Sequence, residues 1–336
     1  MNYFITGGTG FIGTHLASLL HEVHPETRIY NLDIVEPGTP LPTVKNYKPA
    51  LGNGEEHAAT FIYCDVRQPI ELEKVNITPD DVIFNFAAVH RTPGHPDPAY
   101  FETNIRGAEN VCAFAERHGI RKIVFTSSIA PYGAAEELKE ETTLPMPNTP
   151  YGISKLVAEK IHQTWQAGGE GRQLTIVRPG VVFGRGENGN FTLYWGIRGH
   201  KFMYPGRKDT IKACIYVKEL VRFMLYRLEH HDSGVELYNC CYEPAYTIEH
   251  IVESMKRVTN MKVKVPFMPG WLIMTVAGIA GALGSPMGIC PARVRKLQIS
   301  TNICGKKLSA SGYRFRYTFE EALADWYKDN GNLYLQ

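Results

Sequence analysis

The sequence predicts an α/β fold in which a doubly wound parallel sheet carries a smaller C-terminal α/β region. Three observations lead to this expectation. Short apolar runs alternate with helix-like patterns through the first half, a glycine-rich turn joins the first strand to the first helix, and the regular alternation ends near Gly184. Strands separated by helices form parallel sheets that are covered on both faces, because each crossover lays a helix against the sheet.

The elements are expected in the following order. Strands are predicted at 3–5, 28–34, 60–65, 82–88, 122–127, 174–177 and 215–217. Helices are predicted at 13–20, 100–118, 151–166, 217–228, 247–259 and 319–330. The polar, proline-rich stretch 137–149 is expected to be a loop. Residues 1–180 should form a Rossmann-type domain to which parts of 205–240 return, and 181–336 should be mainly a substrate-binding region.

Composition and charge are those of an ordinary globular protein. The 336 residues are 44% hydrophobic and 21% charged, which excludes a disordered or low-complexity chain. The formal net charge of +2 gives no bulk electrostatic reason to expect nucleic acid or an anionic membrane as a partner. The seven cysteines are scattered without metal-ligand spacing, so we expect reduced thiols and no metal site. A strand at the very start, in place of a signal segment, indicates the cytoplasm.

One stretch stands apart because residues 265–292 contain no charged side chain. Prolines and glycines interrupt it, so that only about Trp271 to Leu283 can form a continuous helix, which is too short to cross a bilayer. A core helix or a lid over the substrate pocket is the favoured interpretation. Contact with a membrane surface is the less favoured alternative.

A glycine-rich motif, Thr6-Gly7-Gly8-Thr9-Gly10-Phe11-Ile12-Gly13, follows the first strand and opens the first helix. Gly7 permits the tight turn, Gly10 lets the backbone approach a pyrophosphate, and Gly13 lets helix and strand pack closely. The free N–H groups and the positive dipole end of the helix favour an anion at this place. The motif therefore predicts a dinucleotide site.

The cofactor is expected to be NAD. Asp33 closes the second strand, 20 residues after Gly13, where a carboxylate can accept hydrogen bonds from both ribose hydroxyls. The same carboxylate would repel the 2′-phosphate of NADP, and Ile34 offers no compensating charge. Asp65, at the end of another strand, is positioned to hold the adenine amino group or simply to cap its strand.

The predicted catalytic group is Tyr151, four residues before Lys155 on one face of a helix. A free tyrosine hydroxyl has a pKa of about 10, and a nearby ammonium would lower it by stabilising the phenolate. The pair makes sense as an acid/base unit. The sequence Thr126-Ser127-Ser128 ends a strand where ligands of open α/β sheets bind, and a hydroxyl there could hold the oxygen that Tyr151 protonates.

Taken together, these motifs resemble those of the extended short-chain dehydrogenase/reductases, and within them the NAD-dependent nucleotide-sugar epimerases and dehydratases. The resemblance covers residues 1–230 well. The matching features are TGGTGFIG, Asp33, Cys64-Asp65-Val66, Phe86-Ala87-Ala88, Asn104 in ETNIRGAENV, TSSIAPYG, the Tyr151/Lys155 pair and Arg178-Pro179-Gly180.

The resemblance implies Ser128 as the catalytic hydroxyl, Tyr151 as the acid/base, and Lys155 as the partner that holds the ribose and lowers the tyrosine pKa. Asn104 is implied as a structural or cofactor-positioning residue. Further cofactor contacts are implied for Phe11, Ile12, Val66, Phe86, Ala87, Ala88, Tyr151, Lys155 and Pro179. It also implies a homodimer formed through the 100–118 helix and the Tyr151 helix, and a context in polysaccharide biosynthesis.

Missing residues narrow the reaction. Relatives that eliminate water or decarboxylate carry acidic groups just after the catalytic hydroxyl, where this chain has Ile129 and Ala130. The cysteine that 3,5-epimerising relatives place after the serine pair is also absent. What remains needs one acid/base and a hydride acceptor, which favours inversion at C4 through a transient 4-keto sugar.

Recognition of the substrate is expected in the second half. A nucleotide sugar brings a diphosphate, which relatives hold at places occupied here by Asn190, Lys212 and Arg293, with Arg207 and Lys208 competing for the role of Lys212. For each of these cations a solvated surface charge is the alternative. His90 either contacts the substrate or caps its own loop.

Other functions stay open at this point. A hydroxysteroid-like or other small-alcohol dehydrogenase, or a nucleotide-sugar 4-ketoreductase, could use the same acid/base residues. A dinucleotide-sensing regulator is the non-enzymatic alternative, but it would not need the Tyr151/Lys155 pair.

Overall fold

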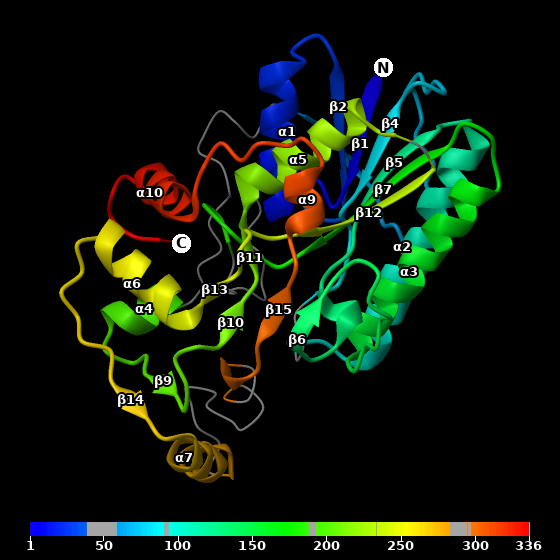
Figure 1. Ribbon diagram of the computed structural model, residues 1–336. Helices are drawn as coiled ribbons and strands as arrows, with labels where there is room; N and C mark the ends of the chain where they lie inside the picture. Colours follow the sequence, from blue (N-terminus) through cyan, green and yellow to red (C-terminus); the bar gives the residue numbers. More distant parts are fainter. Residues whose placement is uncertain are drawn as a thin grey trace.

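A large parallel sheet with helices on both faces dominates the chain, as the computed structural model shows (Figure 1). The structure describes residues 1–38, 59–90, 94–187, 193–232, 234–282, 294 and 297–335. The predicted fold class, a doubly wound α/β fold, is confirmed.

The sheet has seven strands in the order β12-β7-β5-β4-β1-β2-β3, and every neighbouring pair is parallel. The strands are β1 (Asn2–Thr6), β2 (Arg28–Asp33), β3 (Thr60–Tyr63), β4 (Val82–Asn85), β5 (Lys122–Thr126), β7 (Gln173–Pro179) and β12 (Val235–Cys240). From β1 the chain adds β2 and β3 on one side. It then crosses back and adds β4, β5, β7 and β12 on the other side of β1. Ligands of open α/β sheets bind at such a reversal, at the carboxyl ends of the strands.

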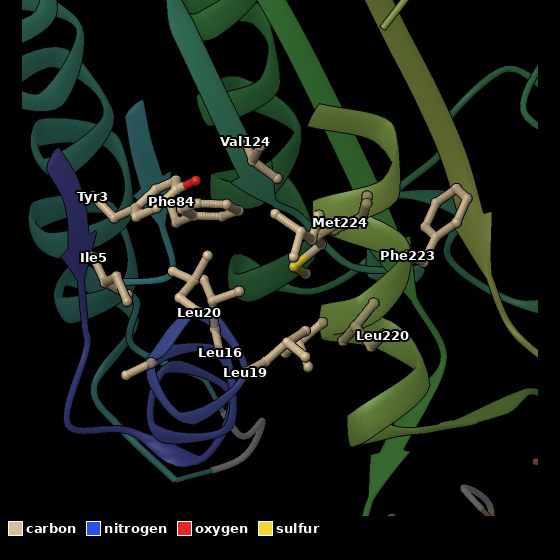
Figure 2. Close-up of a cluster of buried hydrophobic side chains, with 14 of the residues drawn as sticks. Tyr3, Ile5, Leu16, Leu19, Leu20, Phe84, Val124, Leu220, Phe223 and Met224 are labelled. Carbon is tan, nitrogen blue, oxygen red and sulfur yellow. The ribbon is translucent and has the colours of Figure 1, made fainter. Parts of the chain in front are cut away.

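Two helix layers cover the sheet. On one face lie α1 (Phe11–Val23) and α5 (Val217–Glu229), which pack against each other, and on the other lie α2 (Asp97–Arg117) and α3 (Pro150–Ala167). Successive side chains of β1 serve opposite faces, as the pleat of a strand requires. Tyr3 and Ile5 join the α1/α5 side, shown in Figure 2, and Phe4 joins the α2/α3 side.

The remaining elements build a smaller region beyond the large sheet (Figure 1). Its strands are β6 (Ala135–Lys139), β8 (Val181–Phe183), β9 (Tyr204–Pro205), β10 (Ile211–Lys212), β11 (Cys214–Tyr216), β13 (Tyr246–Thr247), β14 (Phe267–Met268) and β15 (Thr301–Ile303). Its helices are η1 (Ala130–Tyr132), α4 (Leu193–Arg198), α6 (Ile248–Val258), α7 (Gly270–Ala282) and α10 (Phe319–Asp329), whereas α9 (Lys306–Ala310) packs against β12 of the large sheet. A second core, with Phe183, Tyr216, Phe319 and Trp326 fully buried, holds this region together.

Some of these elements differ from the sequence expectation. Part of the expected loop 137–149 is strand β6, because β6 pairs with β15, more than 160 residues away, and a short-range pattern cannot reveal that pairing. Strand β12 was not expected either. It lies in the returning segment 205–240 and adds to the edge of the large sheet beside β7.

Helix α7 is not a core helix. Its bounds match the expectation closely, yet the Trp271 side chain is 73% exposed and that of Ile279 is 59% exposed. The helix lies at the edge of the molecule, away from both cores (Figure 1). Among the described residues, no helix is both long enough and apolar enough to span a membrane.

Candidate active site

A cavity of about 850 Å³ lies at the carboxyl edge of the large sheet, where the strand order reverses between β1 and β4. Its volume is in the range of about 300–1,000 Å³ that cofactor and ligand sites occupy. The residues predicted to bind the cofactor all line it: Gly7, Gly10, Phe11, Ile12, Asp33, Asp65, Val66, Phe86, Ala87, Ala88, Tyr151, Lys155 and Pro179. Ser128 and His90 line it as well.

The glycine loop is built for close backbone approach. Gly7 has φ of 70°, a conformation that side chains other than glycine's disfavour, and a Cβ there would lie 2.8 Å from the Ala87 nitrogen. Gly10 then precedes the first turn of α1 in extended conformation without any side-chain cap. The first N–H groups of α1 are therefore left for a ligand, which is the arrangement that binds a pyrophosphate.

Asp33 joins the end of β2 to the glycine loop. Its Oδ2 accepts a hydrogen bond from the Thr9 N–H at 3.1 Å, and its Oδ1 accepts one from the Val35 N–H at 3.2 Å. Each carboxylate oxygen has a second lone pair that can accept from a ribose hydroxyl. The donors and acceptors of this end of the cavity thus suit the adenosine half of NAD.

Asp65 carries a partner that sequence reasoning missed. The Arg67 guanidinium donates to both of its carboxylate oxygens, at 2.9 Å from Nε to Oδ1 and 2.6 Å from Nη2 to Oδ2. These hydrogen bonds lower the pKa of Asp65. Arg67 itself lines the cavity and is about half exposed, so it brings a positive charge to the adenosine end. Its place two residues after Asp65 was the available signal.

Tyr151 and Ser128 meet at the other end of the cavity. Thr149 caps α3 by accepting the Gly152 N–H at 3.1 Å, and Pro150 occupies the first turn, where its missing N–H costs nothing. Gly152 allows α3 to approach the 128–132 segment, since a Cβ there would lie 2.7 Å from the Ala130 oxygen. The Tyr151 and Ser128 side chains both line this end of the cavity, and Ser128 acts to lower the pKa of Tyr151.

Burial, and not Lys155, dominates the pKa of Tyr151 in this structure. Burial raises the pKa of Tyr151 to about 12, opposed only by the hydrogen bond with Ser128. Burial also lowers the pKa of Lys155 to about 7. The Lys155 ammonium points back to the sheet, where Nζ donates to the Thr126 carbonyl at 2.8 Å and lies 4.9 Å from the centre of the Phe125 ring.

A buried polar network supports this catalytic end from beneath. Glu159 accepts the Ser127 hydroxyl at 2.5 Å and the Arg178 guanidinium at 2.8 Å from Nε and 2.6 Å from Nη2. Burial opposes the charge on Arg178, but the hydrogen bonds and charge of Glu159 outweigh burial and raise the pKa of Arg178. The network fixes α3 to the ends of β5 and β7. Glu159 was missed, although it continues the four-residue spacing of Tyr151 and Lys155.

Asn104 positions the loop that carries His90. Its Oδ1 accepts the Val89 N–H at 2.8 Å, and its Nδ2 donates to the Val89 oxygen at 3.1 Å and to the buried Ser154 hydroxyl at 2.8 Å. Asn104 therefore ties α2, α3 and the loop after β4 together. Glu102 and Thr103, immediately before it, line the cavity and were not anticipated.

The predicted diphosphate-binding residues are not brought to the cavity by the described part of the chain. Lys212 donates from Nζ to the Ile299 carbonyl at 2.7 Å and is not among the described residues that line the cavity. Its competitors are engaged in ion pairs on the surface, Arg207 with Glu136 and Asp209, and Lys208 with Glu249. Asn190 and Arg293 lie outside the described residues.

The fold and this cavity are those of a dinucleotide-dependent enzyme. The NAD dependent epimerase/dehydratase family matches residues 3–241, and the chain belongs to that family. Its members use NAD, so the predicted cofactor and the predicted class of enzyme, an NAD-dependent epimerase, are confirmed.

Known relatives agree with this assignment. The chain is 30% identical over 329 residues to an N-acetyl-alpha-D-glucosaminyl-diphospho-ditrans,octacis-undecaprenol 4-epimerase of Escherichia coli O157:H7, covering 96% of this chain and 93% of the relative. Among solved structures, a UDP-N-acetylglucosamine 4-epimerase of Methanobrevibacter ruminantium M1 has a TM-score of 0.74 at 20% identity, covering 98% of both chains. A UDP-glucuronic acid 4-epimerase of Bacillus cereus in complex with NAD has a TM-score of 0.73 at 18% identity, covering 99% of both chains.

Proposed function

We propose that this enzyme inverts the configuration at C4 of a sugar attached to a diphosphate. The observation that carries the proposal is the Ser128/Tyr151 hydroxyl pair in a cavity whose adjoining wall is Ile129 and Ala130. Dehydration would need a separate acid and base, and these two side chains can supply neither. One proton-transferring group with a bound dinucleotide is sufficient for inversion through a 4-keto sugar.

In the proposed mechanism the glycine loop and Asp33 would hold NAD, which would supply the hydride chemistry at the sugar carbon. The Tyr151 hydroxyl exchanges the proton of the C4 oxygen, and Ser128 holds that oxygen by a hydrogen bond. Lys155 lies one helical turn beyond Tyr151, and its low pKa allows it to change protonation near neutral pH. The sugar turns over within the cavity between the two steps, so that both faces of C4 are used.

Two carriers for the diphosphate follow from the relatives. Nucleotide sugars are named for the structural neighbours, and a polyprenol-linked sugar is named for the Escherichia coli relative that matches nearly the whole chain. Both carriers present the same hexose and the same diphosphate to the cavity. The assay therefore includes UDP-N-acetylglucosamine and N-acetylglucosaminyl diphosphoundecaprenol.

We also propose a homodimer formed through α2 and α3, which pack against each other along one face of the sheet. The support is the resemblance to relatives that pair these two helices, together with the partly exposed outer face of α3 at Ile153.

The experiment that tests the function is C4 inversion by the purified enzyme and by Tyr151→Phe. Removing the acid/base should lower kcat by about 10²–10⁴-fold while bound NAD is retained, because positioned proton transfer contributes a factor of that size. Proton NMR of the sugar follows inversion, and absorbance at the NADH wavelength follows reduction. Net NADH release without inversion would identify a dehydrogenase instead, and a fully active Tyr151→Phe variant would remove Tyr151 from the mechanism.

A further inference from the structure

Helix α7 presents an apolar surface that neither core of the protein covers. Five large apolar side chains on β14 and α7 are exposed: Phe267 at 52%, Trp271 at 73%, Leu272 at 36%, Val276 at 45% and Ile279 at 59%. We call these five residues the α7 patch. A contiguous exposed patch of this kind marks a surface that binds another apolar body.

Helix α7 has no polar face that could be directed to solvent. None of its 13 residues is charged, and the hydroxyl of Thr275 donates to the Trp271 carbonyl within the helix at 2.9 Å. Glycine and alanine fill much of the remainder. A run of this length is too short to cross a bilayer, and such runs serve as core helices or as segments lying in the membrane interface. Exposure of the α7 patch excludes the first of these roles.

The charged residues that flank α7 in the sequence are of one sign. Residues 258–305 contain five cations, Lys262, Lys264, Arg293, Arg295 and Lys296, and no Asp or Glu. Outside these 48 residues the chain has 31 Lys and Arg against 34 Asp and Glu, so the near-neutral total conceals a local excess of positive charge.

The described cations of this segment face solvent. Lys262 and Lys264 are exposed and alternate with Met261, Val263 and Val265, which pack against the C-terminal core. Acidic side chains at the nearby 206–209 loop are already paired, since Arg207 bridges Glu136 and Asp209. An anionic surface would therefore meet apolar and positive groups together, which is the combination that binds anionic lipid.

The position of α7 suits a surface anchor. Strand β14, directly before it, pairs with β9, and Gly206 contacts Gly270 at the start of the helix, so the patch is fixed to the smaller region. In Figure 1, α7 lies at the opposite end of the molecule from the start of β1. The carboxyl ends of the parallel strands, where the cavity lies, are directed toward that half of the protein.

We propose that the α7 patch inserts into the interface of an anionic lipid bilayer and that Lys262 and Lys264 bind its headgroups. The protein then rests on the membrane surface without spanning it. The inference concerns a surface separate from the catalytic cavity, and it does not depend on the proposed reaction. It would place the cavity beside substrates whose diphosphate is anchored in lipid.

Sedimentation of the full-length protein with vesicles tests the proposal. We expect binding to vesicles of phosphatidylcholine with phosphatidylglycerol, weaker binding to phosphatidylcholine alone, and weakening by salt at about 1 M, where charges are screened within about 3 Å. Trp271→Ser with Ile279→Ser should lower the partition coefficient at least about tenfold, because two large apolar groups no longer leave water. Lys262→Gln with Lys264→Gln should reduce binding to the anionic vesicles only.

The matched control is Leu144→Ser with Met146→Ser, which removes side chains that are 77% and 72% exposed outside the segment. This variant should bind vesicles as the parent does. Circular dichroism spectra and NAD affinities equal to those of the parent would show that each variant keeps its fold.

Tryptophan fluorescence gives a second readout. Trp165 and Trp326 are buried, so in a Trp195→Phe background a blue shift on adding vesicles reports Trp271. Failure of the parent to bind anionic vesicles at low salt, or equal binding by the Trp271/Ile279 variant, would overturn the proposal. A third result would also overturn it: the parent does not bind vesicles but forms an oligomer, and the Trp271/Ile279 variant is a monomer. A second copy of the chain would then cover the α7 patch.

Discussion

At the scale of single residues, the catalytic end of the cavity combines groups whose protonation is controlled by burial. The structure raises the pKa of Tyr151 to about 12 and lowers that of Lys155 to about 7. The Y-x-x-x-K spacing predicted that these side chains share one helix face, but it did not predict which effect would dominate. Burial is the largest cause of both shifts, because α3 packs against the sheet and takes both groups out of water.

Lys155→Met should make the stability of the protein less dependent on pH. The ordinary lysine pKa is about 10.4, so between about pH 7 and about 10 the unfolded chain binds a proton at Lys155 that the folded protein does not. The free energy of unfolding of the parent consequently rises with pH across this window. The variant should be the more stable protein below pH 7, with an advantage that shrinks as pH rises.

Urea unfolding at several pH values between 6 and about 9 measures this difference. Lys160→Met, on the exposed side of the same helix, serves as the control and should show no such trend. A difference between the Lys155 variant and the parent that stays constant with pH would contradict the lowered lysine pKa.

At the scale of elements, the turn between β1 and α1 depends on a backbone conformation and on a close approach. Gly7→Ala should destabilise the protein and abolish NAD binding, because the new Cβ is both strained at φ of 70° and 2.8 Å from the Ala87 nitrogen. Gly331→Ala is the matched control, since Gly331 has φ of 68° but no atom within 4 Å of a Cβ.

Thermal unfolding and NAD titration of both variants separate strain from collision. Strain alone should cost about 1–2 kcal/mol in Gly331→Ala and leave NAD binding intact. Gly7→Ala should lose more stability and also lose binding. Equal losses of stability and equal NAD affinities in the two variants would show that the close approach of Gly7 to Ala87 is not required.

Six of the seven strands of the large sheet, all except β12, could be predicted from the sequence, whereas much of the second half could not. The apolar run of β1 and the apolar spacing of α1 depend on neighbours a few residues away. By contrast, β10 and β15 have only 2 and 3 residues, and β6, β10 and β15 are stabilised by partners far along the chain. The same reason hid Glu159 and Arg67 from the site prediction, because their roles depend on contacts that only the folded chain creates.

Charge shows the same limit of sequence averages. The total of +2 argued against an anionic membrane as partner, and it is correct as a sum. This net charge is the sum of a positive contribution from residues 258–305 and a negative contribution from the rest of the chain. The uncharged run 265–292 was visible in the sequence, but only the exposure of Trp271 distinguishes a surface patch from a core helix.

At the scale of the whole molecule, the proposed dimer makes a prediction about α3. Ile153→Glu places a charge on the 40% exposed outer face of α3 and should convert a dimer into a monomer in sedimentation velocity. Val235→Glu is the matched control, because Val235 is 39% exposed on the edge strand β12. A parent that sediments as a monomer, or an Ile153 variant that stays dimeric, would contradict the α2/α3 interface.

In the proposed inversion, the hydrogen that leaves C4 returns to C4 without exchanging with water. The most direct measurement follows a substrate carrying deuterium at C4 through a full turnover. The inverted product should keep its deuterium at C4 when the reaction runs in ordinary water. Loss of the label to solvent would contradict it, since the C4 hydrogen would then leave as a proton and Tyr151 would be acting at carbon and not at oxygen.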